Sequence, residues 1–148
     1  MSFIYLDWAA TAPADPVILE QVRDVSTRLY GNPSAVHAAG REALQALEDC
    51  RHRLAELLAC SPGEVVFTSG GSESNNMVLF TMLRRKSLRR LVVSAVEHAS
   101  VWEPARSLER LGCEICVVPA EPDGRVDPQR LLAAVDEHTA VVALMLVN

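Results

Sequence analysis

From residue 64 to residue 147 the sequence alternates between short apolar runs and longer amphipathic stretches. The apolar runs are rich in β-branched residues and are bounded by turn residues, so we predict that they are buried strands. The amphipathic stretches repeat their apolar side chains at helical spacing. The predicted order is strand 64–68, helix 77–83, strand 90–96, helix 100–111, strand 114–118, helix 128–135 and strand 140–147. This alternation indicates an α/β fold with a mainly parallel sheet and helices on both of its faces.

Two further helices are predicted before this region. Asp15-Pro16 is a typical helix start, and the helix should run to Leu29, before the break at Gly31-Asn32-Pro33. A longer helix follows and ends near Ser61-Pro62-Gly63, with leucines on one stripe. These leucines are Leu44, Leu47, Leu54, Leu57 and Leu58.

The domain organisation follows from these elements. We expect residues 1–14 to form an N-terminal arm and residues 15–148 to form one domain, because 148 residues suit a single core. The strand predicted at 140–147 is apolar enough to lie in the middle of a sheet, and the sequence stops directly after it. We therefore expect residues 15–148 to be the N-terminal portion of a larger, incomplete domain.

Charge and hydropathy exclude several classes of partner. The formal net charge of -5 disfavours nucleic acid and anionic membranes, which both attract basic surfaces. The first residues lack the positive charge of a secretory signal, and Asp7 interrupts their apolar run. The run at 140–147 is much shorter than the roughly 20 residues that cross a bilayer. We expect a cytoplasmic protein, whose four cysteines are thiols rather than disulfides.

The stretch VVFTSGGSESNNM at 65–77 predicts an anion site. Its loop, 68–74, follows a predicted strand and precedes a helix, which is where ligands of parallel sheets bind. Gly70 and Gly71 allow the backbone to approach an anion, and the amides of the first helical turn favour negative charge. The loop matches no nucleoside triphosphate or dinucleotide motif, so a single phosphate fits better. The alternative is structural: Ser72 caps the helix and Glu73 interacts with its dipole.

Two more polar residues follow predicted strands at the same edge of the sheet. His98 comes after the strand ending at Val96, and Asn148 comes after the strand ending at Val147. An anion cradle, an imidazole that can stack on a ring and an amide together describe a pocket for a phosphorylated aromatic cofactor.

Six pieces of the sequence, in order, resemble the cysteine desulfurases, which belong to the class V aminotransferase group of enzymes that use pyridoxal 5'-phosphate (PLP). The resemblance covers nearly the whole chain. The pieces are IYLDWAATAP at 4–13, GNPSAVHAAGREA at 31–43, VVFTSGGSESNN at 65–76, VEHASV at 96–101, DGRVD at 123–127 and LMLVN at 144–148.

The resemblance implies the first part of the large domain of PLP fold type I. It also implies that Gly71 and Ser72 contact the cofactor phosphate, that His98 stacks on the pyridine ring and moves protons as a catalytic residue, and that Asn148 lies near the ring hydroxyl. The family reaction removes sulfur from L-cysteine to give alanine and an enzyme persulfide, which supplies an iron-sulfur scaffold protein or another sulfur acceptor. The family also implies a homodimer.

Some residues depart from the family pattern. Family members often have Ala-Thr in place of Gly71-Ser72, Asp in place of Asn75, and Tyr or Asn in place of Trp8. The hydroxyl donor is retained at Ser72, so phosphate binding is still expected. The departures leave open other class V members, such as a selenocysteine lyase or an aminotransferase.

The largest departure concerns the Schiff-base lysine that PLP enzymes require. Lys86 is the only lysine, and it lies in the basic run RRKSLRR, where solvation and the preceding helix C-terminus explain its charge. The lysine and the sulfur-accepting cysteine of the family would lie beyond residue 148. We therefore expect the chain alone to be inactive, and a non-catalytic module that binds a phosphate or a partner is the alternative.

The cysteines do not indicate a metal site. Cys113 and Cys116 have C-x-x-C spacing, but residues three apart on a strand face opposite sides of a sheet, and no second pair of ligands is evident. Cys50 and Cys60 are interpreted as packing residues. The remaining histidines, which are His37, His52 and His138, are interpreted as structural.

Overall fold

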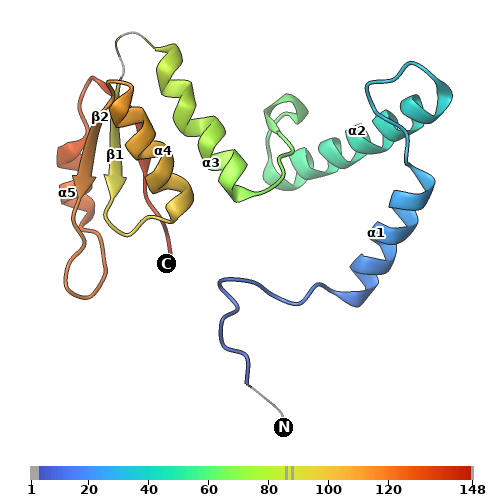
Figure 1. The fold of residues 1–148 in the computed structure, drawn as a ribbon, viewed down its shortest axis with the longest axis horizontal. Helices are drawn as coiled ribbons and strands as arrows, with labels where there is room; N and C mark the ends of the chain where they lie inside the picture. The colour runs from blue at the N-terminus through green and yellow to red at the C-terminus, as the bar shows by residue number, and fades with distance from the viewer. Residues whose placement is uncertain (1–3, 86, 88, 148) are drawn as a thin grey trace. The chain divides into compact units, whose positions relative to one another are not determined.

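The computed structural model describes residues 4–85, 87 and 89–147. Its internal contacts divide the chain into two compact units, residues 1–66 and residues 67–148, which are described separately below (Figure 1). None of the helices formed by the described residues is long and apolar enough to cross a membrane.

The first unit contains two helices that begin close to the positions predicted from the sequence. α1 spans Pro16–Arg28, and the Asp15 carboxylate caps it by accepting the Val17 N–H at 2.8 Å. α2 spans Ala38–Leu58 and is capped by His37, whose Nδ1 accepts the Gly40 N–H at 3.2 Å. A short 3-10 helix, η1, follows at Pro62–Glu64.

The turn between α1 and α2 requires glycine at two positions. A Cβ atom at Gly31 would lie 2.2 Å from the carbonyl oxygen of Ala39, and one at Gly40 would lie 2.4 Å from that of Ala35. The Asn32 side chain also fixes this turn by accepting the Ser34 N–H at 2.9 Å. Backbone packs on backbone here, which explains the glycines at both ends of GNPSAVHAAG.

The apolar faces of both helices are more exposed than their sequence pattern suggests. α1 has no buried residue, and on α2 the leucine stripe includes Leu57 at 82% and Leu58 at 66% exposed. The helical spacing is therefore confirmed, whereas burial of the stripe within this unit is not found. Only Gly40, Ala43 and Ala55 of α2 are buried.

The second unit alternates helices and strands in the predicted order. The elements are α3 (Gly71–Phe80), η2 (Thr81–Arg84, a 3-10 helix), β1 (Arg90–Ser94), α4 (Ala99–Arg110), β2 (Glu114–Val118), α5 (Pro128–Ala134) and β3 (Thr139–Ala143).

The three strands form one parallel sheet in the order β2-β1-β3, which confirms the predicted α/β class. Arg90 of β1 is opposite Glu114 of β2, and Val93 of β1 is opposite Ala143 of β3. Their carboxyl ends therefore share one edge, where α4 begins after β1. In Figure 1, β1 and β2 run side by side, with α4 and α5 packed beside them.

β1 is the centre of the core because it is paired on both sides. Leu91 and Val93 are fully buried and belong to one cluster with side chains of α3, η2 and α4. Val92 and Ser94 point to the opposite face and are also fully buried. The other members of the cluster are Leu79, Met82, Val101, Ala105, Leu108 and Cys113.

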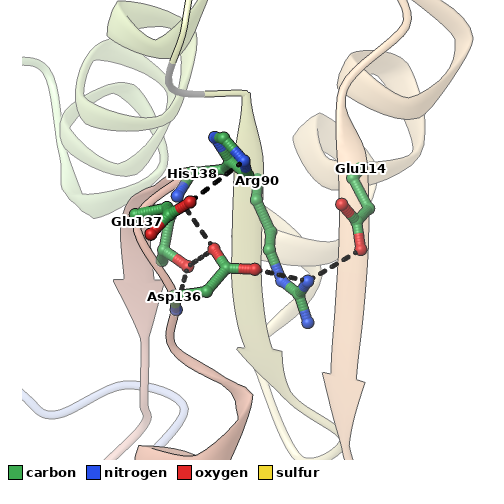
Figure 2. A network of polar contacts seen from close by, with 6 residues as sticks. Arg90, Glu114, Asp136, Glu137 and His138 are labelled. Atoms are coloured by element: carbon green, nitrogen blue, oxygen red, sulfur yellow. Dashed lines mark hydrogen bonds and ion pairs between the residues drawn. The ribbon is translucent and has the colours of Figure 1, made fainter.

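An ion network ties the three strands together at the amino end of the sheet (Figure 2). The Arg90 guanidinium contacts Glu114 of β2 at 3.1 Å and Asp136, which precedes β3, at 2.8 Å. Burial raises the pKa of Asp136, but the Thr139 hydroxyl, the His138 N–H and the Arg90 charge outweigh it, so the pKa lies below its ordinary value.

One predicted strand and several bounds differ from the sequence-based prediction. The run 64–68 does not form a strand: Glu64 ends η1, and residues 65–68 have no regular secondary structure and lie outside the described sheet, with Val66 60% exposed. Apolar β-branched composition without a paired neighbour does not make a strand. α3 begins at Gly71 rather than Met77, β1 ends at Ser94 rather than Val96, and β3 ends at Ala143 rather than Val147.

Candidate functional site

The glycine loop leads directly into α3. Gly70 is the N-cap, so Gly71, Ser72 and Glu73 form the first helical turn. The structural alternative is therefore wrong about Ser72, which is not the N-cap, but Glu73 does lie in the first turn as that alternative expected. A Cβ atom built at Gly70 or Gly71 would meet nothing within 4 Å. The open space over these glycines fits a ligand group that approaches the first-turn amides.

Hydroxyl and carboxyl groups fix the shape of this loop. The Thr68 Oγ1 and Ser74 Oγ atoms are 2.8 Å apart, and the Ser74 N–H donates to the Gly70 carbonyl at 3.1 Å. Glu73 Oε2 accepts the Ser69 N–H at 2.6 Å, and this hydrogen bond lowers the pKa of Glu73. The ionised carboxylate therefore uses one amide donor of the loop and places a negative charge beside it.

His98 is the N-cap residue of α4, at the carboxyl end of β1. Its Nδ1 accepts the backbone N–H of Ser100 at 3.0 Å and lies 2.9 Å from the Ser100 hydroxyl. Asn75 of α3 donates from Nδ2 to that hydroxyl at 2.8 Å. The imidazole is therefore connected to α3 through Ser100.

His98 and Asn75 border a cavity of about 350 Å³. Its polar lining comes from Asn75, Glu97 and His98, and its apolar lining comes from α3, Val101 of α4 and residues 141–145. Gly71 lies one helical turn before Asn75 on α3. Asn148, which was predicted to share this edge, lies outside the described residues, as does Lys86.

Sequence reasoning missed Glu97. Its Oε1 accepts the Ser94 hydroxyl at 2.7 Å and the Met145 N–H at 2.5 Å. Ser94 ends β1 and Met145 follows β3, so one carboxylate joins the ends of two adjacent strands. The signal was present in the sequence, because Glu97 directly follows the same strand as His98, but the bond to Met145 spans 48 residues.

Ser100 and Asn75 were also missed as parts of the His98 environment. A serine two residues after a candidate histidine is unremarkable in sequence, and it acquires a role only because His98 begins a helix. In the sequence, Asn75 is notable only because it replaces a charged Asp of family members. In the structure its amide donates to the hydroxyl of Ser100, 25 residues away in sequence.

The described residues contain no group of three or more His, Cys, Asp or Glu side chains that could hold a metal ion. Cys113 is buried in the core cluster, and Cys116 is in β2 opposite Val92. The C-x-x-C segment thus lies at the start of a strand, as the sequence predicted.

Comparison with known proteins agrees with this arrangement. The sequence model of the family described as aminotransferase class-V matches residues 4–148. The chain belongs to this family. It is 37% identical over 147 residues to the cysteine desulfurase IscS of Dictyoglomus turgidum, and 36% identical over 148 residues to the human cysteine desulfurase. These alignments cover 98% of the chain and 37% and 32% of the two relatives.

Solved structures of family members have the same fold. A NifS-like protein superposes with a TM-score of 0.82 at 34% identity, over 90% of the chain and 37% of that protein. The protein SspA, solved in complex with cysteine, superposes with a TM-score of 0.82 at 30% identity, over 93% of the chain and 40% of that protein. The chain thus has part of the large-domain fold of PLP enzymes of fold type I, and it spans well under half the length of the relatives it matches.

Proposed function

We propose that the chain contributes the cofactor-binding edge of a PLP-dependent cysteine desulfurase. The observation that supports this most directly is the position of His98, which borders the cavity and is held between the start of α4 and the first turns of α3. The family and the cysteine desulfurase names of its relatives favour this reaction over other class V chemistry.

In this proposal the residues of the chain bind and orient the cofactor. The first-turn amides at Gly71 and the hydroxyl of Ser72 hold the phosphate, since a helix N-terminus with open space above its glycines suits an anion. The imidazole of His98 stacks on the ring, and Asn148 contacts the ring hydroxyl. When bound, PLP supplies an electron sink for reactions at the amino-acid substrate.

The complete enzyme would remove sulfur from L-cysteine, leaving alanine and passing a persulfide to an iron-sulfur scaffold protein or another acceptor. We place this protein in the cytoplasm. We also propose that residues 15–148 belong to the PLP-binding large domain and that residues 1–14 form its N-terminal arm. Exposed apolar side chains of α1, among them Val17 and Leu19, support self-association as a homodimer.

PLP titration of the chain tests the proposed site. We expect saturable binding, followed by changes in PLP absorbance, and a loss of affinity of at least about tenfold in Ser72→Ala, which removes a charge-assisted hydrogen bond. His98→Ala should weaken binding to a similar degree. His52→Ala, which alters an exposed histidine of α2, is the matched control. Binding unaffected by Ser72→Ala and His98→Ala would contradict the assignment.

A phosphate-binding module without its own chemistry is the second candidate, and the sequence feature that favours it is the single lysine, Lys86, in a basic run. Both candidates lack a Schiff-base site within this chain. Borohydride reduction of the chain mixed with PLP distinguishes them from a chain that is active alone. We expect reversible binding without a stable covalent adduct. A stoichiometric adduct on Lys86 would show that this chain carries its own Schiff-base site.

A further inference from the structure

The hydrogen bonds around His98 determine which ring nitrogen carries the proton. A backbone N–H can only donate, so the Ser100 N–H at 3.0 Å requires Nδ1 to be an acceptor. In the neutral imidazole the proton must then be on Nε2. This conclusion does not depend on the orientation of any amide side chain.

The Ser100 hydroxyl supports the same tautomer. It lies 2.9 Å from Nδ1 of His98 and accepts the Asn75 amide at 2.8 Å. Because the hydroxyl oxygen accepts from Asn75, its own proton is left to point toward Nδ1, whose lone pair it shares with the Ser100 N–H. The Nδ1 edge of the ring is thus occupied by donors, which leaves Nε2 as the ring nitrogen for a ligand in the cavity that His98 lines.

We propose that Ser100, oriented by Asn75, is a positioning residue that holds His98 as the Nε2–H tautomer, so that the imidazole presents a hydrogen-bond donor to the cavity. The role in catalysis rests on the proposed function, because it assumes that the cavity receives PLP and an amino-acid substrate. His98 would then donate a hydrogen bond, through Nε2–H, to an anionic substrate atom. It could not accept a proton at Nε2 unless the Ser100 contacts were broken first.

The position of Asn75 gives this arrangement a second consequence. Asn75 is on α3 and Ser100 is on α4, so the proton on His98 is controlled from the helix that also carries Gly71 and Ser72. A neutral amide at position 75 donates to Ser100. A carboxylate there would accept instead and would turn the hydroxyl proton away from Nδ1.

Nitrogen NMR of the labelled chain at alkaline pH tests the proposal. We expect Nδ1 of His98 to resonate as an unprotonated nitrogen and Nε2 as a protonated one. In Ser100→Ala and Asn75→Ala the tautomer ratio should shift toward Nδ1–H by about fivefold, which corresponds to one ordinary hydrogen bond. Ser107→Ala on α4 and Asn76→Ala on α3 are matched controls that should leave the ratio unchanged.

The outcomes separate this inference from the proposed function. A predominant Nδ1–H tautomer in the unaltered chain would overturn the inference without any variant. An unchanged ratio in Ser100→Ala or in Asn75→Ala would overturn the part assigned to that residue. If the unaltered chain has the expected tautomer but shows no saturable PLP binding, the proposed function fails and the positioning role of Ser100 stands.

Discussion

Glu97 and Met145 are joined by a hydrogen bond of 2.5 Å between the carboxylate Oε1 and the backbone N–H, although they are 48 residues apart in sequence. The same oxygen accepts the hydroxyl of the fully buried Ser94. The sheet ladder between β1 and β3 ends at Val93 and Ala143, and the Glu97 side chain continues the connection beyond it. Residues 144 and 145, which line the cavity, are thereby held next to His98.

Replacing Glu97 should loosen this edge of the sheet. We expect Glu97→Ala to lower the free energy of unfolding by about 2 kcal/mol, the usual value for hydrogen bonds to a charged group. The Met145 amide should also exchange with solvent faster. Hydrogen exchange followed by mass spectrometry and denaturant titration measure the two effects.

Glu103→Ala is the control for this experiment, because Glu103 forms only an exposed ion pair with Arg106 on α4. Glu97→Gln keeps a carbonyl acceptor, so its loss of stability should lie between those of Glu97→Ala and Glu103→Ala. Unchanged Met145 exchange in Glu97→Ala would show that the carboxylate does not hold this segment.

The charge of Glu73 should weaken anion binding at the start of α3. Its carboxylate accepts the Ser69 N–H, and the lowered pKa keeps it ionised through the neutral range. Glu73→Gln retains an acceptor for Ser69 but removes the charge. We expect the affinity for inorganic phosphate to rise by about two- to fivefold, the usual range for one charge at a helix terminus.

Calorimetric titration with phosphate measures this change. Glu109→Gln alters a carboxylate near the C-terminal end of α4 and should have no effect on the affinity for phosphate. A fall in phosphate affinity in Glu73→Gln would mean that the carboxylate supports the loop more than it repels the anion.

The two glycines of the α1–α2 turn should not tolerate alanine. At an ordinary helical position, alanine is favoured over glycine by about 1 kcal/mol. Gly40→Ala should instead destabilise the chain by about 1–3 kcal/mol, because its Cβ would lie 2.4 Å from the Ala35 carbonyl oxygen. Gly63→Ala, where a Cβ meets nothing within 4 Å, should change stability by less than about 0.5 kcal/mol. Thermal unfolding followed by circular dichroism compares the two variants, and equal melting temperatures would refute the close approach.

Asp136 should make stability depend on pH in the acid range. Its folded-state pKa lies below the ordinary aspartate value, so the unfolded chain binds this proton more readily. The stabilisation is therefore present above the ordinary pKa and is lost as the pH falls below about 4.

Asp136→Asn should remove part of this acid dependence and lower stability near neutral pH, because Arg90 loses a partner. Urea unfolding at a series of pH values measures both effects. Asp49→Asn, on the exposed side of α2, is the control. If the stability of Asp136→Asn changed with pH in the same way as that of the unaltered chain, the prediction would be contradicted.

The fold was largely predictable from the sequence, because the helical and strand periods of residues 90–143 are local properties. β2 was predicted at its observed bounds, and the parallel sheet followed from the alternation of elements. The run at 64–68 shows the limit of this reasoning. Its composition is that of a strand, but a strand is defined by its hydrogen-bonded neighbour, and composition does not reveal whether that neighbour exists.

The sequence predicted which edge of the sheet carries the site, but it did not predict the contacts among the residues of the site. The position of His98 after β1 followed from the strand prediction, and the glycine loop followed from its composition. Its connection to Asn75 through Ser100, and that of Glu97 to Met145, depend on the approach of segments far apart in sequence. Residue types alone do not specify such pairs.

The strand order β2-β1-β3 also bears on how the second unit folds. β2 is much nearer to β1 in sequence than β3 is, so the β1–β2 pair closes the shorter loop and should form first. β3 then has to return across the chain to the free side of β1. The Met145 amide reaches Glu97 only after that step. The cavity beside His98 should therefore be completed last, so a slow refolding phase would be seen at the cavity rather than in the core.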